Sequence, residues 1–230
     1  MNLQQRPSLR VFVAGDSTAA SYAQEREPLS GWGQAIGRFF QPLVEVRNRA
    51  VSGSSSKSFL EKGHWHSLVQ ELRAGDYVLI QFGHNDAKDD PNRHTDPGSS
   101  FPSYLRGYVE DAGSKGAYPV LLTPVERREV TADGGHAPTH GPYAEAVRQL
   151  AHDSRVPLLE LSQASLDLYR EWGAARSREL FLWLEPGAYP AYPEGKQDDT
   201  HFCRLGAETV AGLIAGLIRN SPLELRRYLA

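Results

Sequence analysis

The sequence predicts a three-layer α/β/α domain built on a five-stranded parallel sheet. Short apolar runs recur at roughly regular intervals along the 230 residues. They are continuous rather than alternating, which is typical of strands that helices cover on both faces. The segments between them carry apolar residues at helical spacing. Because strands alternate with helices along the chain, we expect parallel pairing and layers of helix on both sides of the sheet.

Five apolar runs are the predicted strands. Each is rich in Val, Leu, Ile or aromatic residues and is bounded by Gly, Pro, Asp or Asn, which interrupt regular structure. In chain order they are Val11–Ala14, Leu43–Val46, Tyr77–Phe82, Tyr118–Thr123 and Val156–Leu161.

Three segments between or after these runs are predicted helices, because their apolar residues recur at intervals of three and four. The first contains Tyr104, Leu105, Tyr108 and Val109, and the second contains Tyr143, Ala146, Val147 and Leu150. The third is the clearest, with an apolar stripe formed by Leu205, Val210, Leu213, Ile214, Leu217 and Ile218.

Two segments are predicted to be long loops. Lys88–Ser100 is crowded with Asp, Pro, Asn and Gly, and Glu185–Thr200 contains three prolines and two glycines. Loops of this length are usually functional, and ligands of open α/β sheets bind at the carboxyl ends of the strands. No internal repeat and no linker-like stretch interrupts the chain, so we expect a single domain over residues 1–230 with its core at about 10–220.

Composition excludes several classes of protein. The formal charge is −3, from 25 Lys and Arg against 28 Asp and Glu, and no basic block stands out, so nucleic acid is not an expected partner. The single cysteine, Cys203, excludes an intrachain disulfide and a cysteine-based zinc site. No run is long enough to span a bilayer, and the polar segment Met1–Leu9 lacks the features of a secretory signal. We therefore expect a cytoplasmic protein with no membrane partner.

Four polar motifs lie next to the predicted strands or before the last helix. Each has an ordinary structural explanation, because Ser and Asp cap helices and Gly, Asn and Asp form turns. Each also suits catalysis. In chain order they offer a serine hydroxyl, a glycine whose backbone N–H can point into a cavity, an asparagine amide that can stabilise an oxyanion, and a carboxylate three residues before a histidine. The motifs are Gly15–Thr18, Asn48–Ser54, Gly83–Asp86 and Asp198–His201.

In this order, the four motifs resemble the signature of the SGNH (GDSL-like) hydrolase superfamily. The resemblance extends from Val11 to about Ile218 and implies the flavodoxin-like SGNH hydrolase fold. Longer stretches resemble the rhamnogalacturonan acetylesterase branch of that superfamily. These stretches are Ala14–Thr18, Gly31–Gln34, Asn48–Lys57, Gly83–Ala87 and Asp199–Phe202.

The resemblance implies a role for each of five residues. Ser17 is the expected nucleophile, His201 the general acid and base, and Asp198 the residue that orients His201. The expected oxyanion hole consists of the backbone N–H groups of Ser17 and Gly53 and the side chain of Asn85. The family needs no metal and no organic cofactor. An α/β-hydrolase is disfavoured because the sequence contains no Gly-x-Ser-x-Gly elbow.

Several aromatic residues are candidates for substrate contact, each with a structural alternative. Trp32 lies either at the wall of the substrate pocket or in the core. His84 either lines the acyl pocket or contacts a sugar, or it satisfies a loop hydrogen bond. The rings of Trp183, Tyr189 and Tyr192 either stack on a sugar or anchor the long loop.

The remaining histidines and the cysteine are expected to have no role in catalysis. His64 and His66 form one pair and His136 and His140 another, and both pairs are predicted to be solvated surface residues rather than metal ligands. Cys203 is predicted to be a buried small side chain rather than a second nucleophile.

The protein is predicted to be a serine esterase that takes part in the degradation of pectin. It removes acetyl groups from rhamnogalacturonan fragments through an acyl-enzyme on Ser17, and an acetylated oligosaccharide is its expected partner. The cytoplasmic location favours short imported oligosaccharides over polymer. One alternative is the same chemistry on acetylated xylan or short acyl esters. Another is a catalytically silent carbohydrate-binding relative, which the presence of all five site residues disfavours. The oligomeric state does not follow from the sequence.

Overall fold

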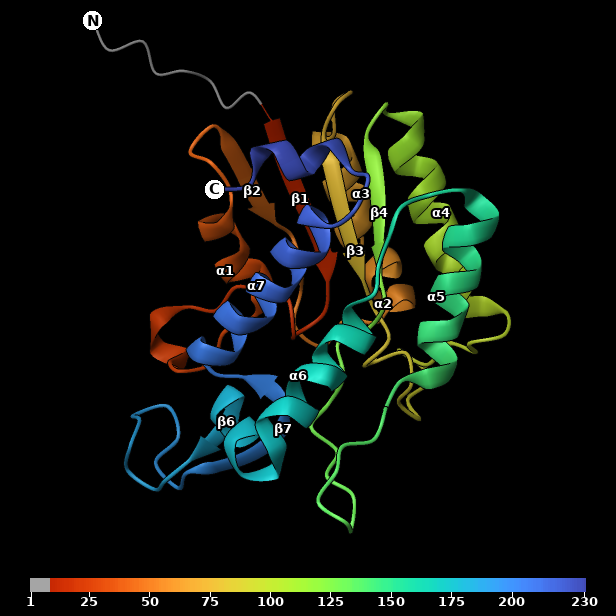
Figure 1. The fold of residues 1–230 in the computed structure, drawn as a ribbon. Helices are drawn as coiled ribbons and strands as arrows, with labels where there is room; N and C mark the ends of the chain where they lie inside the picture. The colour runs from red at the N-terminus through yellow and green to blue at the C-terminus, as the bar shows by residue number, and fades with distance from the viewer. Residues whose placement is uncertain (1–8) are drawn as a thin grey trace, which may run out of the picture.

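The computed structural model describes residues 9–230, which fold around a five-stranded parallel sheet (Figure 1). Its strand order is β2-β1-β3-β4-β5, and every neighbouring pair is parallel. This confirms the predicted fold class. The strands are β1 (Leu9–Gly15), β2 (Val44–Asn48), β3 (Tyr77–Gln81), β4 (Tyr118–Leu122) and β5 (Leu158–Leu159).

The sheet is buried on both faces, as its continuous apolar strands predict. Along β1, Val11 and Val13 belong to one hydrophobic core, whereas Phe12 and Ala14 belong to the other. All four side chains are inaccessible to solvent. Successive side chains of a strand point to opposite faces, so one short strand contributes to two cores.

Helices form the outer layers. One core includes side chains of three helices, α1 (Trp32–Ala35), α6 (Leu161–Arg176) and α7 (Arg204–Arg219). The opposite core includes side chains of four others, namely α2 (Ser56–Glu61), α3 (His64–Glu71), α4 (Ser100–Ser114) and α5 (Gly141–Ser154). Short 3-10 helices η1 (Gln24–Arg26), η2 (Ile36–Phe39), η3 (Ser177–Leu180) and η4 (Glu224–Tyr228) complete the connections.

The predicted stripe of α7 packs against the sheet. Val210, Ile214 and Ile218 are fully buried in the core, but Leu205 is 46% exposed. Leu205 lies in the first turn of the helix, where it points to solvent while the next residues, Gly206 and Ala207, are buried, so its membership of the stripe that faces the core was wrong.

A second, two-stranded sheet was not predicted. Strands β6 (Phe181–Leu184) and β7 (Lys196–Phe202) pair in antiparallel fashion, so part of the predicted loop Glu185–Thr200 is a strand. The polar residues of β7 lack the β-branched and aromatic character that indicates a strand. The other predicted loop, Lys88–Ser100, is irregular except that Ser100 begins α4.

The N-terminal segment before Leu9, which was predicted to carry no secretory signal, lies outside the described residues. Within residues 9–230, none of the helices combines the length and the apolar character that crossing a membrane requires.

Gly206, in the first turn of α7, lies in close contact with the backbone of Leu180. A Cβ atom at this position would lie 1.9 Å from the carbonyl oxygen of Leu180, whereas a Cβ at Gly216 of the same helix would meet nothing within 4 Å. We expect Gly206→Ala to lower the free energy of unfolding by about 1–3 kcal/mol through overpacking. Gly216→Ala, the matched control, should raise it by about 0.5–1 kcal/mol through helix propensity.

Urea unfolding of both variants checks this prediction. Equal stability of Gly206→Ala and the parent protein would show that α7 does not need this close approach.

Candidate active site

The predicted nucleophile lies in a tight turn at the end of β1. Ser17 is nearly buried, and the turn around it is held by Asp16, whose Oδ1 accepts hydrogen bonds from the backbone N–H and the hydroxyl of Thr18 at 2.9 and 2.8 Å. The backbone N–H groups of Ala19 and Ala20 donate to the carbonyl of Asp16. Local hydrogen bonds therefore fix the backbone that carries Ser17.

The structure brings His201 and Asp198 to this serine. Nε2 of His201 lies 3.1 Å from Oγ of Ser17, and Nδ1 of the same ring lies 2.9 Å from Oδ2 of Asp198. When Nδ1–H donates to the carboxylate, Nε2 is free to accept the proton of the serine hydroxyl. The three side chains thus have the connectivity of a catalytic triad.

Asp198 is held as a carboxylate. Its Oδ1 accepts the backbone N–H groups of Thr200 and His201, both at 2.9 Å. Burial alone would raise the pKa of Asp198, but the hydrogen bonds from the ring and backbone of His201 outweigh burial and lower this pKa well below its usual value. The ionised carboxylate fixes the ring orientation and stabilises an imidazolium.

The neighbouring Asp199 has a different role. It points to Arg128 and Trp183, whose Nη1 and Nε1 atoms donate to its Oδ1 at 2.7 and 2.8 Å. The guanidinium of Arg128 is itself buried and also donates to Ser177 Oγ at 3.0 Å. Asp199 therefore anchors β7 to the body of the molecule. Trp183 contributes to this anchor, which agrees with one of the two roles predicted for it, while its stacking on a sugar stays a prediction. No sequence pattern indicates Arg128.

The expected oxyanion-hole residues follow three adjacent strands. Ser17, Gly53 and Asn85 come after β1, β2 and β3, whose carboxyl ends share one edge of the sheet. Gly53 has a φ of +81°, a conformation that other residues adopt only with strain. Asn85 is buried, and its Nδ2 donates to the carbonyl of Ser54 at 2.9 Å. The placement is consistent with the expected role, and the stabilisation of an oxyanion stays a prediction.

Comparison with known proteins agrees with this geometry. Residues 13–205 match the GDSL-like Lipase/Acylhydrolase family. The chain belongs to this family. The chain is 40% identical to the rhamnogalacturonan acetylesterase RhgT of Bacillus subtilis, over 96% of this chain and 94% of the relative. It is 34% identical to the probable rhamnogalacturonan acetylesterase YesY of the same organism, over 94% of each.

A solved structure has the same fold. The crystal structure of protein YxiM from Bacillus subtilis superposes with a TM-score of 0.80 at 24% identity, and the match covers 93% of this chain and 57% of that one. Together with the family match, this confirms the predicted superfamily, the fold and an ester hydrolase.

Asp86, the last residue of the third GDSL-family motif, holds three segments of the site together. Its carboxylate accepts hydrogen bonds from the backbone N–H groups of Ser56 and Gly83, both at 3.1 Å, and from the hydroxyls of Ser56 and Thr95 at 2.5 and 2.8 Å. Burial, only partly offset by these bonds, raises the pKa of Asp86 to about 6. The motif alone predicts no role for Asp86, although the acidic residue beside Asn85 is a sequence signal that could have indicated one.

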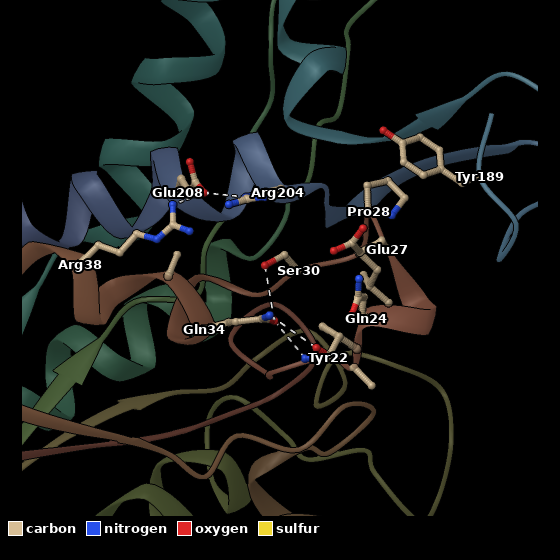
Figure 2. Close-up of a pocket in the computed structure, with 13 residues that line it drawn as sticks. Tyr22, Gln24, Glu27, Pro28, Ser30, Gln34, Arg38, Tyr189, Arg204 and Glu208 are labelled. Atoms are coloured by element: carbon tan, nitrogen blue, oxygen red, sulfur yellow. Dashed lines mark hydrogen bonds and ion pairs between the residues drawn. The ribbon is translucent and has the colours of Figure 1, made fainter.

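Tyr22 is a further residue that sequence reasoning missed. Its hydroxyl donates to the backbone carbonyl of Ser17 at 2.7 Å, and Gln34 Oε1 accepts the backbone N–H of Tyr22 at 2.9 Å (Figure 2). Tyr22 therefore packs directly against the turn of the nucleophile. An isolated tyrosine in a polar stretch carries no sequence signal for this contact.

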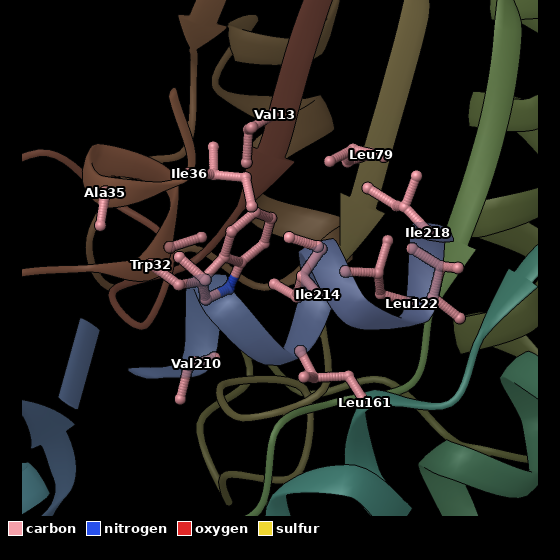
Figure 3. Packing of buried hydrophobic residues seen from close by; sticks show 14 of the residues in the cluster. Val13, Trp32, Ala35, Ile36, Leu79, Leu122, Leu161, Val210, Ile214 and Ile218 are labelled. Atoms are coloured by element: carbon pink, nitrogen blue, oxygen red, sulfur yellow. The ribbon is translucent and has the colours of Figure 1, made fainter. Parts of the chain in front are cut away.

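Trp32 lies in the core and not at a pocket wall. Its side chain is fully buried among residues that include Val13, Ile36 and Ile214 (Figure 3). The predicted contact of Trp32 with substrate is wrong because no part of the side chain is accessible.

Trp32 instead contributes a hydrogen bond to the network that holds the turn of Ser17. Its Nε1 donates to Gln81 Oε1 at 2.8 Å, and Gln81 Nε2 donates to the hydroxyl of Thr18 at 3.0 Å. This chain of hydrogen bonds links the core to the turn that holds Ser17. Gln81, a polar residue within an apolar strand, is the sequence signal that could have indicated this link.

His84 satisfies a loop hydrogen bond. Only 2% of the residue is exposed, its Nε2 donates to the carbonyl of Val125 at 2.8 Å, and its ring lies 4.2 Å from that of His140. Burial, reinforced by the neighbouring positive charges, lowers the pKa of His84 well below its usual value, so the ring is neutral. The structure thus favours the loop alternative over contact with a sugar.

His136 and His140 are buried, at 5% and 1% exposure, so their predicted surface position was wrong. They lie within the fold because His136 Nε2 contacts Ser177 at 3.2 Å and His140 faces the carboxylate of Glu126 at 3.6 Å. His66 is exposed and His64 half-buried. Among the residues that the structure describes, no three metal-ligating side chains cluster.

Cys203 is half-buried rather than fully buried. Its thiol donates to the carbonyl of Glu179 at 3.0 Å. Burial raises the pKa of this thiol, which disfavours the reactive thiolate.

Asn85→Ala tests the expected oxyanion hole. Loss of one preorganised donor should lower kcat on a chromogenic acetyl ester by about 10²–10³-fold. Asn220→Ala, at an exposed asparagine after α7, is the matched control and should leave kcat unchanged. Steady-state kinetics on both variants measures this loss of kcat, and circular dichroism confirms that the variants are folded. Retention of kcat within twofold would remove Asn85 from the oxyanion hole.

Glu126 should make stability depend on pH. Burial opposes its charge, but hydrogen bonds from His140, Ser162 and Thr139 dominate and lower the pKa of Glu126 to about 2. A carboxylate with a depressed folded-state pKa stabilises the protein above its unfolded-state pKa, and this stability is lost as pH falls toward the folded-state value. Relative to Glu126→Gln, the protein should be more stable at pH 6, by up to about 3 kcal/mol, because folding lowers the pKa of Glu126 from 4.5 to about 2.

Urea unfolding at pH 6 and pH 3 measures this difference. The advantage over Glu126→Gln should shrink at pH 3, and an advantage that is independent of pH would contradict the role of the charge.

Proposed function

We propose that the protein is a serine esterase that removes acetyl groups from pectin-derived carbohydrate, specifically rhamnogalacturonan fragments, through an acyl-enzyme on Ser17. The observation that carries the proposal is the continuous hydrogen-bonded path from Ser17 through His201 to Asp198. In a chain 40% identical to RhgT over nearly its whole length, this path supports a carbohydrate acetylesterase.

The geometry supports a two-step mechanism. The Ser17 hydroxyl attacks the acetyl carbonyl while Nε2 of His201 takes its proton, and Asp198 stabilises the imidazolium that forms. The tetrahedral oxyanion is stabilised by the N–H groups of Ser17 and Gly53 and by the amide of Asn85. Collapse of the intermediate expels the sugar alkoxide, which takes the proton from His201.

The second step uses the same residues. His201 takes a proton from water, the resulting hydroxide attacks the acetyl-Ser17 carbonyl, and acetate leaves as Ser17 regains its proton. Both steps use the same side chains and backbone N–H groups of this chain, together with one water molecule.

We further propose that the enzyme is cytoplasmic and that its substrates are short oligosaccharides. A cytoplasmic enzyme meets short oligosaccharides, so we expect faster acetate release from rhamnogalacturonan oligomers than from polymer. Initial rates on both test this expectation, and a preference for long polymer would contradict it.

Ser17→Ala tests the mechanism. The parent protein should release acetate from a chromogenic acetyl ester, and the variant should lose all but a small residual rate because the nucleophile is gone. Ser103→Ala, at an exposed serine of α4, is the matched control and should keep full activity. Activity that survives in Ser17→Ala would refute the acyl-enzyme on Ser17.

Initial rates on acetylated rhamnogalacturonan and xylan oligomers then test the substrate. A higher rate on rhamnogalacturonan is expected, and a higher rate on xylan would favour the alternative ester. A parent protein that binds the oligomers but hydrolyses no ester would instead be the silent carbohydrate-binding relative.

A further inference from the structure

Asp198 and His201 form the catalytic pair of β7, and the contacts that join them lie within that strand. Oδ2 of Asp198 lies 2.9 Å from Nδ1 of His201, and Oδ1 of Asp198 accepts the backbone N–H groups of Thr200 and His201. These contacts survive any movement that displaces residues 198–201 as a unit. They therefore fix the geometry of the catalytic pair but not its distance from Ser17.

The distance from the catalytic pair to Ser17 depends on what holds β7 in place. Nε2 of His201 lies 3.1 Å from Oγ of Ser17. However, β7 pairs with β6 in a sheet separate from the central one that leads to Ser17 (Figure 1). The end of β7 is tied to the body of the molecule by the N–H of Ser30, which donates to the carbonyl of Phe202 at 3.0 Å. A second anchor lies next to Asp198.

This second anchor is Arg128, which holds Asp199 through both its backbone and its side chain. The backbone N–H of Arg128 donates to the carbonyl of Asp199 at 2.9 Å, and Nη1 of Arg128 donates to Oδ1 of Asp199 at 2.7 Å. Trp183 Nε1 donates to the same oxygen at 2.8 Å, and the guanidinium carbon of Arg128 lies 5.5 Å from the centroid of the Trp183 ring. Asp199 lies between the two residues of the catalytic pair, so the anchor acts inside the segment that carries both.

Arg128 can hold β7 in place because its own position is determined by buried contacts. Its side chain is 5% exposed, its Nε donates to Ser177 Oγ at 3.0 Å, and its Nη2 donates to the carbonyl of Ala174 at 2.5 Å. Burying a guanidinium costs free energy unless its N–H groups are paired, so these acceptors leave it few other positions. Arg128 also comes soon after β4, and it therefore connects the central sheet to β7.

We propose that Arg128 is a positioning residue of the reaction. Acting through Asp199, it keeps the catalytic pair at hydrogen-bond distance from Ser17. This inference rests on the proposed function, in which His201 takes the proton of Ser17. A misplacement of about 1 Å in the reacting groups can cost on the order of 10²-fold in rate. Weakening the anchor should therefore lower kcat and leave the binding of a small ester nearly unchanged.

Two variants remove the opposite partners of the contact between Arg128 and Asp199. Arg128→Gln and Asp199→Ala are each expected to lower kcat on a chromogenic acetyl ester at least tenfold and to change KM less than twofold. Arg178→Gln is the matched control, because Arg178 is exposed and its guanidinium also lies near Trp183, at 4.5 Å from the ring centroid. This control should keep kcat within twofold of the parent protein.

A double variant shows whether the two residues act through one contact. Arg128→Gln/Asp199→Ala should lose no more kcat than the more impaired single variant, because either substitution already breaks the contact. Losses that multiply would show independent effects and would overturn the proposal. Retention of kcat by folded Arg128→Gln or folded Asp199→Ala would also overturn it, and so would an equal loss in Arg178→Gln.

Thermal unfolding of each variant identifies any loss that comes from misfolding. If Arg128→Gln does not fold, Asp199→Ala remains a test, because the side chain of Asp199 is 40% exposed and its truncation leaves no hole in the core.

Hydrogen exchange separates this proposal from the proposed function, because it needs no turnover. The amides of β7 should exchange faster in Asp199→Ala than in the parent protein, since a weaker anchor makes local opening easier. Faster exchange would support the anchor even if Ser17→Ala kept its activity, an outcome that would refute the proposed function alone. Unchanged exchange in β7 would overturn the proposal.

Discussion

The hydrogen bond between Ser17 and His201 is the contact on which the rest of the site depends. It joins residues 184 positions apart, one at the end of the first strand and one just before the last long helix. Neither side chain is a catalyst alone, since a serine hydroxyl is a weak nucleophile until a base accepts its proton. The end of β1 lies at the edge of the parallel sheet, and β7 and the start of α7 lie next to that edge, so Ser17 and His201 come into contact there.

Both partners of that contact are held in place by networks of hydrogen-bonded polar side chains, most of them buried. Trp32 and Gln81 brace the turn of Ser17, while Arg128 and Asp199 anchor the strand that carries His201. Asp86 does the same for the loops that bear Gly53 and Asn85. Leaving a buried polar group without a partner costs free energy, so each such network has few alternative arrangements. The networks therefore hold the reacting atoms at fixed positions.

Sequence patterns predicted the parts of the molecule that local interactions determine. The strands of the sheet were recognisable because two-sided burial demands continuous apolar runs, and α7 because one-sided burial demands a stripe. The contact of Asp198 with His201 was predictable because the two residues are only three positions apart. The motif order then identified Ser17 as their partner. The β6–β7 hairpin was missed because its polar strand β7 pairs with β6 rather than with the central sheet.

Packing between distant segments decided what these patterns left open. A tryptophan beside a motif has the same sequence signature whether it faces a sugar or the core, and Trp32 lies in the core because strands and helices from distant parts of the chain surround it. The polar neighbours of His136 and His140 in the sequence predict surface positions, yet both residues are buried and contact Ser177 and Glu126 from other parts of the chain. A cavity beside Tyr22 has the same origin, since its walls come from three separate segments. Local sequence thus specified the elements and the chemistry of the triad. Tertiary structure specified burial and the shape of the site, because both depend on residues that no local pattern brings together.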